Sequence, residues 1–431
     1  MSIAYGGIIA FLFRGMNLVV ALATVVLTSR VLSASEYGLF GLALSVVGFV
    51  NAMTGGLAAA TAYQISNQRR AAGVVVLNSG SLALALGIGA VAAGVAAGSA
   101  LSGEVSHVAA SVAIAAAAVI ANSVISGMFL GRESFIRYNL TLVGPPLIAL
   151  VAIVCTFFVL DERSPEAALW AYAAGQSLSV VAMLLLGRGN LTRQVRFEGR
   201  LAREVVRFTL LAGISSGISF LNYRADLFIV DFFEGQAGVG PYLLAVYIAE
   251  SVWQVSGSLA LATYARVGSL SREAAAELTT RVMRHTVVLL GVVCGGLFVV
   301  ADLVEAALGG EKYAGVASAL RFLLPGVLVY GLAQSFSGFY TYQRGLPWVA
   351  ALVAGTGLIL DVALAILLVP RMGINGAALA SAIAYSAAII AGLAVFVRRE
   401  QLGAQQVFRF GRAELEDYRG LYTRLRQVVA R

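Results

Sequence analysis

Long apolar runs alternate with short polar stretches along the whole of this sequence. Each run holds about 20 residues, the length that an α-helix needs to cross the hydrocarbon core of a bilayer. The pattern therefore predicts an all-α, polytopic membrane protein. We expect twelve membrane-spanning helices, at residues 8–32, 38–58, 74–98, 107–130, 139–160, 167–187, 205–232, 241–262, 285–308, 318–340, 347–369 and 376–397.

Two pairs of short motifs indicate that the predicted helices form a repeat. "GLFGLA" at residues 38–43 and "GPYLLA" at residues 240–245 share a Gly, an aromatic residue and an Ala at the same spacing. "EAALWAY" at residues 166–172 and "GAALASA" at residues 376–382 form the second pair. Because six is an even number of helices, both halves keep the same orientation in the membrane. We expect two pseudo-symmetric lobes, with a substrate site at their interface.

The longest internal loop follows the sixth predicted helix and divides the chain. We expect an N-terminal lobe at residues 1–187, a cytoplasmic connecting loop at 188–204, a C-terminal lobe at 205–398 and a cytoplasmic tail at 399–431. Apolar positions recur in the tail at every third or fourth residue, which predicts an amphipathic basic helix on the inner membrane surface. Docking of a partner protein is the alternative role for this tail.

Composition and charge agree with a membrane protein and exclude nucleic acid as a partner. The chain is 59% hydrophobic and 12% charged, with a formal net charge of +8. Its basic residues gather in the loops, with fifteen in the connections on the side of the N-terminus and five on the other side. Basic residues are retained in the cytoplasm during insertion, so we expect both termini to be cytoplasmic.

Motifs for nucleotide, metal or covalent chemistry are absent from the sequence. It has no Gly-rich ATP-binding loop and no nucleophile elbow. The two histidines, His107 and His285, lie at the ends of predicted helices, and Cys155 and Cys294 lie in separate apolar runs. We therefore expect no cofactor, no metal site and no enzymatic activity.

Polar residues inside the predicted helices are the candidates for function. Arg224 lies in "SFLNYRADLFIVDFF" at residues 219–233, together with Asn222, Asp226 and Asp231. On an unbroken helix Asn222 and Asp226 share one face, while Arg224 points nearly opposite. Arg14 lies in the first helix, which is the corresponding helix of the other half. Two interpretations stay open for the arginines: snorkelling with structural ion pairs, or contact with an anionic substrate.

Intramembrane carboxylates and amides form a second group of candidates. Asp226, Glu250 and Asp361 are candidates for coupling transport to a proton or a sodium ion, because a buried carboxylate is costly unless protonated or paired. Polar side chains that are expected to line a cavity and bind sugar hydroxyls are Asn51, Asn122, Gln176, Asn222, Gln254, Gln334 and Tyr340. For each of them, a hydrogen bond between helices is the alternative.

Gly213 and Gly217 form a Gly-xxx-Gly pair in the seventh predicted helix. Either the helix bends there to line a cavity, or the small residues allow another helix to pack closely.

Several segments resemble those of a known family. They are "SRVLSASEYGLFGLALSVVGF", "NYRADLFIVDFFEGQAGVGPYLLAVYIAESV" and "MGINGAALASAIAYSAAI". In order and spacing they resemble polysaccharide flippases of the O-antigen and exopolysaccharide type, within the multidrug, oligosaccharidyl-lipid and polysaccharide exporter (MOP) superfamily. The resemblance implies two six-helix lobes around a central cavity, with alternating access. It also implies that Arg14 and Arg224 meet the pyrophosphate of a lipid-linked sugar. Asp361 departs from the pattern, because an uncharged polar residue is more usual there.

The function expected from these features is that of a flippase in a bacterial cytoplasmic (inner) membrane. It would move an undecaprenyl-pyrophosphate-linked oligosaccharide to the outer leaflet for surface polysaccharide biosynthesis, with polysaccharide synthesis proteins as partners. A cation-coupled multidrug antiporter of the same superfamily is the alternative, favoured by Glu250 and Asp361 and disfavoured by the two arginines. A membrane-bound glycosyltransferase is a third class, and the short outer loops argue against it.

Overall fold

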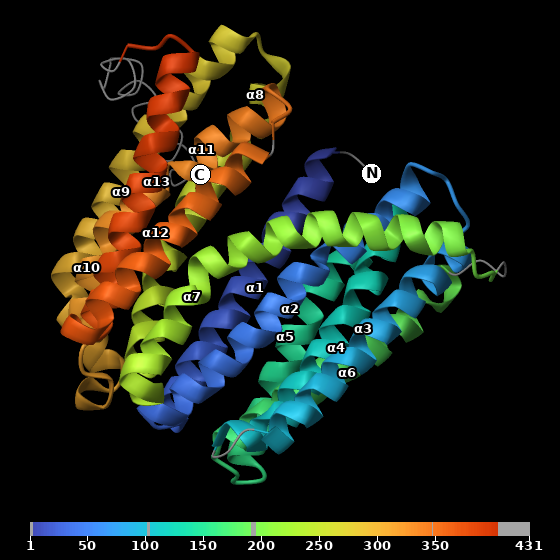
Figure 1. Cartoon of the computed structure of the whole chain (residues 1–431). Helices are drawn as coiled ribbons and strands as arrows, with labels where there is room; N and C mark the ends of the chain where they lie inside the picture. Colours follow the sequence, from blue (N-terminus) through green and yellow to red (C-terminus); the bar gives the residue numbers. More distant parts are fainter. Residues whose placement is uncertain (1–2, 101–103, 191–194, 347, 404–431) are drawn as a thin grey trace, which may run out of the picture. The chain divides into compact units, whose positions relative to one another are not determined.

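The computed structural model describes residues 3–100, 104–190, 195–346 and 348–403, and the regular structure within these ranges is helical (Figure 1). Eleven helices of this part are long and apolar enough to cross a membrane. In chain order the helical elements are α1 (Ile3–Val31), α2 (Ala34–Ser66), α3 (Ala72–Ala100), α4 (Glu104–Gly131), α5 (Phe135–Phe158), α6 (Pro165–Gly187), η1 (Arg188–Asn190), α7 (Gly199–Ser251), α8 (Trp253–Ser269), α9 (Arg272–Leu308), η2 (Gly310–Tyr313), α10 (Val316–Tyr330), α11 (Ala333–Gly338), η3 (Phe339–Gln343), α12 (Trp348–Met372) and α13 (Ile374–Arg399).

The unusually long α7 contains two of the predicted spans. Gly235 interrupts it with φ 68° and ψ −178°, a conformation outside the helical region that glycine tolerates best. The part before Gly235 matches the predicted helix at 205–232, and the part after it begins the helix predicted at 241–262. We call these parts the first and second segments of α7. The prediction of an all-α, polytopic membrane protein is confirmed.

Polar residues at helix starts explain where the apolar runs begin. Ser33 accepts a hydrogen bond from the Glu36 backbone N–H, and the Glu36 carboxylate accepts one from the Ser33 N–H at 2.7 Å. This capping box satisfies two backbone donors that would otherwise lack partners at the start of α2. At the start of α6 the Ser164 hydroxyl accepts a hydrogen bond of 3.2 Å from the Ala167 N–H, and Pro165 lies in the first helical turn.

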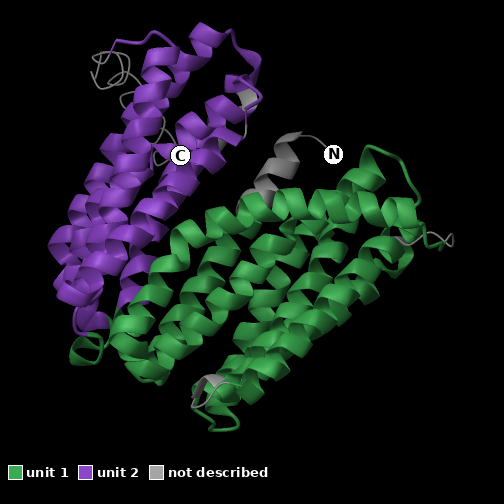
Figure 2. Ribbon diagram, in the orientation of Figure 1, with its two compact units in different colours: residues 1–241, 308–313 green, residues 242–307, 314–431 purple. Residues whose placement is uncertain are grey.

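By their internal contacts, the residues form two compact units (Figure 2). Unit 1 comprises Met1–Pro241 with Leu308–Tyr313, and unit 2 comprises Tyr242–Ala307 with Ala314–Arg431. In unit 1, α4 packs against α2, α3 and α6, while in unit 2, α13 packs against α10 and α12. The assignment of residues 205–241 to a C-terminal lobe stays a prediction. The predicted tail helix from residue 404 onward lies outside the described residues.

The first segment of α7 packs closely against α2 inside unit 1. A Cβ added to Gly213 would meet the backbone carbonyl of Met53, and one added to Gly217 would meet the Met53 sulfur. On the α2 side, a Cβ added to Gly56 would lie 2.7 Å from the Thr209 carbonyl oxygen. The helix keeps its hydrogen bonding through both glycines. Close helix packing, rather than a bend, is therefore the role of this Gly-xxx-Gly pair.

Two glycines that the repeat matches also meet each other. A Cβ at Gly38 would meet the carbonyl of Gln236, and a Cβ at Gly240 would meet the carbonyl of Ala34. Residues 34 and 38 are each separated from 236 and 240 by the same offset of 202 positions. Each position thus contacts the repeat equivalent of its own neighbour, as in a contact across a two-fold axis. The starts of α2 and of the second segment of α7 thus pack closely on each other, and the parallel repeat stays a prediction.

Candidate functional site

The charged stretch of α7 lies in its first segment, within unit 1. Asn222 and Asp226 are buried, at 1% and 2% exposure, and Arg224 between them is half-buried. The burial pattern confirms that the amide and the carboxylate share a face that Arg224 does not share. A guanidinium nitrogen of Arg224 donates to the Tyr223 carbonyl at 2.7 Å. One nitrogen of its charged group therefore lies at the helix backbone.

Arg14 lies on α1, also in unit 1, and its side chain is exposed. It is eleven residues from the start of α1 and seventeen from its end, so it lies on the order of 17 Å and 26 Å from the two ends at 1.5 Å per residue. Arg14 belongs to none of the ion pairs formed among the described residues. The two predicted arginines thus lie on different helices in different degrees of burial.

A buried carboxylate on α12 is the centre of a polar chain in unit 2. Asp361 is 1% exposed, and its Oδ1 accepts a hydrogen bond of 3.0 Å from the hydroxyl of Ser381 on α13. The Ser381 oxygen lies 3.4 Å from the hydroxyl of Tyr242, in the second segment of α7. Ser381 and Tyr242 are both fully buried. Three helices therefore meet at one carboxylate that is shielded from water.

Three aromatic rings from α8, α10 and α13 form a cluster in unit 2. Tyr385 lies one turn after Ser381, and its ring centroid is 4.8 Å from that of Tyr330 on α10 and 5.8 Å from that of Trp253 on α8. The Trp253 and Tyr330 centroids are 4.9 Å apart. The Trp253 indole N–H donates to the Val327 carbonyl at 2.9 Å. Tyrosine and tryptophan can pack in an apolar interior while their polar atoms find partners, as this indole does.

Two helix interruptions lie next to the aromatic rings. α7 ends at Ser251 and α8 begins at Trp253, while α10 ends at Tyr330 and α11 begins at Ala333. Interrupted helices within membranes are tolerated where neighbouring groups satisfy the freed backbone atoms. The carbonyl of Val327 accepts from both the Trp253 indole and the Gly331 N–H, which is 3.0 Å away.

The other residues of unit 2 that were predicted to be functional differ in how deeply they are buried. Glu250 is half-buried three residues before Trp253, Gln334 is half-buried on α11, and Gln254 is exposed. Tyr340 is 2% exposed in the π-helical turn η3, where its ring packs against those of Phe339 and Phe396. The surroundings of the Tyr340 ring are therefore those of a core aromatic residue.

The predicted amides of unit 1 do not gather at one place. Asn122 on α4 donates to the Thr141 carbonyl of α5 at 3.0 Å, which is the hydrogen bond between helices given above as the alternative role. Gln176 is buried on α6, whereas Asn51 is exposed on α2.

Sequence reasoning identified Asp361 but missed its partners. Ser381 lies among alanines in "GAALASAIAY", a composition typical of close helix packing. Tyr242 is 139 positions away from Ser381, and no periodicity links residues on separate helices. The spacing of Ser381 and Tyr385, one helical turn apart, was the available signal. Among the described residues, no group of three or more His, Cys, Asp or Glu side chains could hold a metal ion.

No family model matches the sequence, and no curated protein matches it. Solved structures do match. A multidrug resistance MATE family transporter of the MOP superfamily, in an inward-facing conformation, has a TM-score of 0.69 and 18% identity, covering 89% of this chain and 94% of its own.

Two further structures match over similar lengths. The lipid II flippase MurJ, in an inward closed conformation, has a TM-score of 0.73 and 12% identity, covering 94% of this chain and 89% of its own. A MOP superfamily transporter from Pyrococcus furiosus has a TM-score of 0.64 and 18% identity, covering 91% and 94%. All three of these neighbours are transporters or flippases. The chain is a multi-pass membrane protein with the fold shared by MATE transporters and the lipid II flippase.

Proposed function

We propose that this protein is a flippase that moves an undecaprenyl-pyrophosphate-linked oligosaccharide from the inner to the outer leaflet of a bacterial cytoplasmic membrane. The observation that carries the proposal is Arg224, a half-buried guanidinium within a membrane-spanning helix, on the side away from the buried Asn222 and Asp226. A charge at membrane depth is costly, so a guanidinium persists there where it meets protein, water or an anion. The N–H groups of the planar guanidinium can donate parallel hydrogen bonds to two phosphate oxygens.

Arg14 supports the same cargo from the first helix of the chain. Its side chain is exposed and far from both ends of α1. In the proposed cycle, the two arginines offset the charge of the pyrophosphate while it leaves water, and the lipid tail stays in the bilayer. Alternating access of the two lobes then exposes the sugar on the other side. The polysaccharide synthesis proteins that supply or use the lipid-linked sugar are the proposed partners, and both termini are proposed to be cytoplasmic.

Ion coupling is proposed for the carboxylates. Asp361 is the foremost candidate because it is buried and held by Ser381, and Glu250 and Asp226 are the further candidates. A carboxylate in such surroundings can bind a proton or a sodium ion and release it when the helices around it shift. This carboxylate is also the observation that favours the second candidate function, a cation-coupled multidrug antiporter.

The first prediction tests the anionic cargo directly. In liposomes that contain a lipid-linked oligosaccharide, we expect Arg224→Ala to lower the flipping rate by ~10-fold or more, since a hydrogen bond to a charged group contributes about 1.5–3 kcal/mol. Arg14→Ala should lower the rate in the same direction. Arg224→Lys keeps the charge but loses the planar guanidinium, and we expect an intermediate rate.

Arg163→Ala is the matched control for this measurement. Arg163 lies in the connection between α5 and α6, paired at 3.0 Å with Asp161 and 59% exposed, so its loss should leave the rate unchanged. Equal flipping rates for the wild type, Arg14→Ala and Arg224→Ala would contradict the proposal of an anionic cargo. Ion-driven efflux of a cationic dye, with no flipping, would establish the antiporter instead.

A further inference from the structure

A cavity of about 430 Å³ lies in unit 1, and neither Arg14 nor Arg224 lines it. It is lined by residues of α2, α3, α4 and α7, where Phe228 and Asp231 precede Gly235 and Gln236 follows it. Each helix contributes one continuous face, as the lining positions 39, 42, 43, 46 and 50 of α2 illustrate. This volume falls within the range of small-molecule sites, about 300–1,000 Å³.

Small side chains on α3 explain why space remains between tightly packed helices. The lining positions of α3 are Ala90, Ala93, Gly94 and Ala97, which follow the spacing of a single helical face. A Cβ added to Gly94 would lie 3.0 Å from the carbonyl oxygen of Ala109 on α4, so α3 and α4 are in close contact at this point. Since alanines do not fill the space beside this contact, the cavity stays open.

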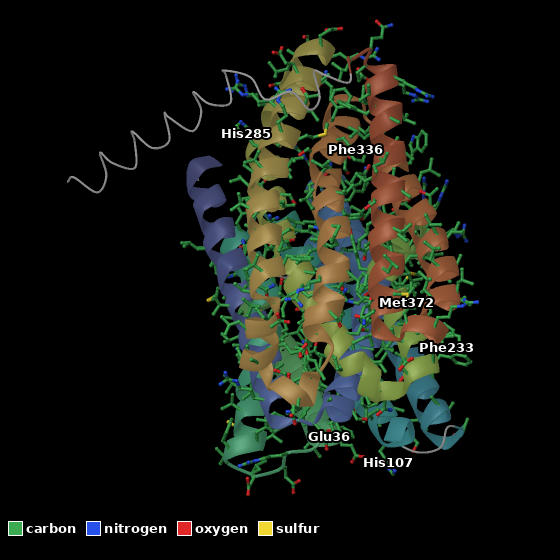
Figure 3. All side chains as sticks on the ribbon, turned by 90° about the vertical axis from the view of Figure 1, so that its left-hand side faces the viewer. Glu36, His107, Phe233, His285, Phe336 and Met372 are labelled. Atoms are coloured by element: carbon green, nitrogen blue, oxygen red, sulfur yellow. The ribbon has the colours of Figure 1, made fainter. Side chains whose placement is uncertain are left out.

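The cavity lies toward one end of the helices that line it. Figure 3 labels Glu36, His107 and Phe233, which lie toward the same end of unit 1. The lining residues begin at Leu39 and Val108, within one turn of Glu36 and His107. From Leu39 to Val50 the lining of α2 extends on the order of 17 Å, about half of a hydrocarbon core.

One carboxylate and one amide lie among the apolar residues that line the cavity. Of the described residues that line the cavity, Asp231 is the charged one and Gln236 the other polar one. Asp231 is partly buried and belongs to none of the ion pairs formed among the described residues. Phe228, three residues earlier on α7, lines the same cavity and is 39% exposed. A carboxylate and an aromatic face on one side of a helix suit an ammonium group.

We propose that this cavity binds an amphiphile with a hydrocarbon body and a protonated amine. The hydrocarbon occupies the apolar space between α2, α3 and α4, and the ammonium pairs with Asp231 beside the ring of Phe228. An anionic headgroup is disfavoured because no basic residue lines the cavity in the described part of the chain. The site is independent of the proposed flippase function, because it uses neither Arg14 nor Arg224.

Photolabelling tests whether the cavity prefers an amine over an uncharged amphiphile. The purified full-length protein, in nanodiscs without aminolipids, is exposed to dodecylamine that carries a photoactivatable diazirine in its alkyl chain. Dodecanol with the same diazirine is the uncharged probe. After irradiation, the labelled peptides are mapped. We expect the amine probe to label α2, α3, α4 and the first segment of α7, at least ~10-fold more strongly than the alcohol at equal concentration.

Variants of the lining residues test separately the role of the carboxylate and that of the free space. Asp231→Asn should reduce amine labelling to the level of the alcohol and leave alcohol labelling unchanged, while Asp231→Glu should retain the preference for the amine. Val46→Trp fills the cavity from α2, where Val46 is 40% exposed, and should abolish labelling by both probes. Asp161→Asn, which changes an exposed carboxylate of the same unit, is the matched control and should change nothing.

Competition identifies the source. If phosphatidylethanolamine displaces the amine probe, the natural ligand is an aminolipid of the bilayer; if only free long-chain amines displace it, the ligand is a soluble amphiphilic amine. Equal labelling by amine and alcohol, labelling outside these helices, or no effect of Asp231→Asn would overturn the proposal. Because Arg224→Ala should leave amine labelling intact, failure of this site and failure of the flippase proposal give different results.

Discussion

The carboxylate of Asp361 shows how one residue can connect three helices. Its Oδ1 accepts from Ser381, whose hydroxyl lies near that of Tyr242, and none of the three is accessible to water. A charge in this position is far more costly than at a surface, so binding of a proton or a cation here would be linked to the arrangement of the helices around it. In the proposed transporter, this link is the basis of ion coupling.

Substitution of Asp361 tests coupling at the residue scale. We expect Asp361→Asn, which keeps the shape of the side chain, to abolish the dependence of transport on a sodium or proton gradient. Ser381→Ala removes one hydrogen bond and should weaken the dependence without abolishing it. Transport into liposomes, measured with each gradient in turn, checks both variants.

Asp302→Asn is the control for this pair of variants. Asp302 is an exposed carboxylate of unit 2 that forms a bidentate pair with Arg321, and exposed pairs contribute about 0–1 kcal/mol. Its loss should leave the gradient dependence intact. A fully gradient-dependent Asp361→Asn protein would exclude this carboxylate from coupling.

At the scale of elements, α7 packs against α2 through close contacts at its glycines. Gly213 and Gly217 lie against Met53 of α2, and Gly240 lies against Ala34 at the other end of the same helix pair. Close approach of this kind maximises van der Waals contact, which drives helix association where lipid offers no hydrophobic contrast. The position of Arg224, Asp226 and Asp231 relative to α2 follows from this packing.

A larger residue at Gly213 should separate the two helices. We expect Gly213→Val to destabilise the protein by about 1–3 kcal/mol, because the added atoms overlap the Met53 carbonyl. Gly55→Ala is the matched control on α2, since a Cβ there meets nothing within 4 Å and alanine favours the helix. Thermal unfolding in detergent compares the two variants, and equal midpoints would contradict the packing interpretation.

At the scale of the whole molecule, a short segment from the second half of the chain belongs to unit 1. Within Leu308–Tyr313, the Lys312 ammonium donates to the Ser29 and Arg30 carbonyls at 2.7 and 3.3 Å, and the Tyr313 hydroxyl donates to Ser29 at 2.7 Å. These donors satisfy carbonyls in the last turn of α1. Burial lowers the pKa of Lys312, partly opposed by the nearby Glu36 carboxylate. Tyr313 is fully buried and meets the Tyr37 ring edge-on.

Removal of these donors should loosen the end of α1. We expect Lys312→Met to increase amide hydrogen exchange in the last turn of α1 and to lower stability by about 1 kcal/mol, because one carbonyl keeps its tyrosine donor. Tyr313→Phe should act in the same direction. Unchanged exchange in the double variant would show that the segment does not stabilise α1.

The sequence by itself determined the membrane-spanning helices, because a backbone in lipid must satisfy its own hydrogen bonds and a run of about 20 apolar residues does so as a helix. It also determined the face of each polar residue, such as the shared face of Asn222 and Asp226. Only the tertiary structure decided which faces meet. Asp361 accepts a hydrogen bond from Ser381, which lies near Tyr242, and Asp231 lines a cavity, because small residues determine how closely the helices pack. Helical periodicity in the sequence does not show which helix will pack against a given face.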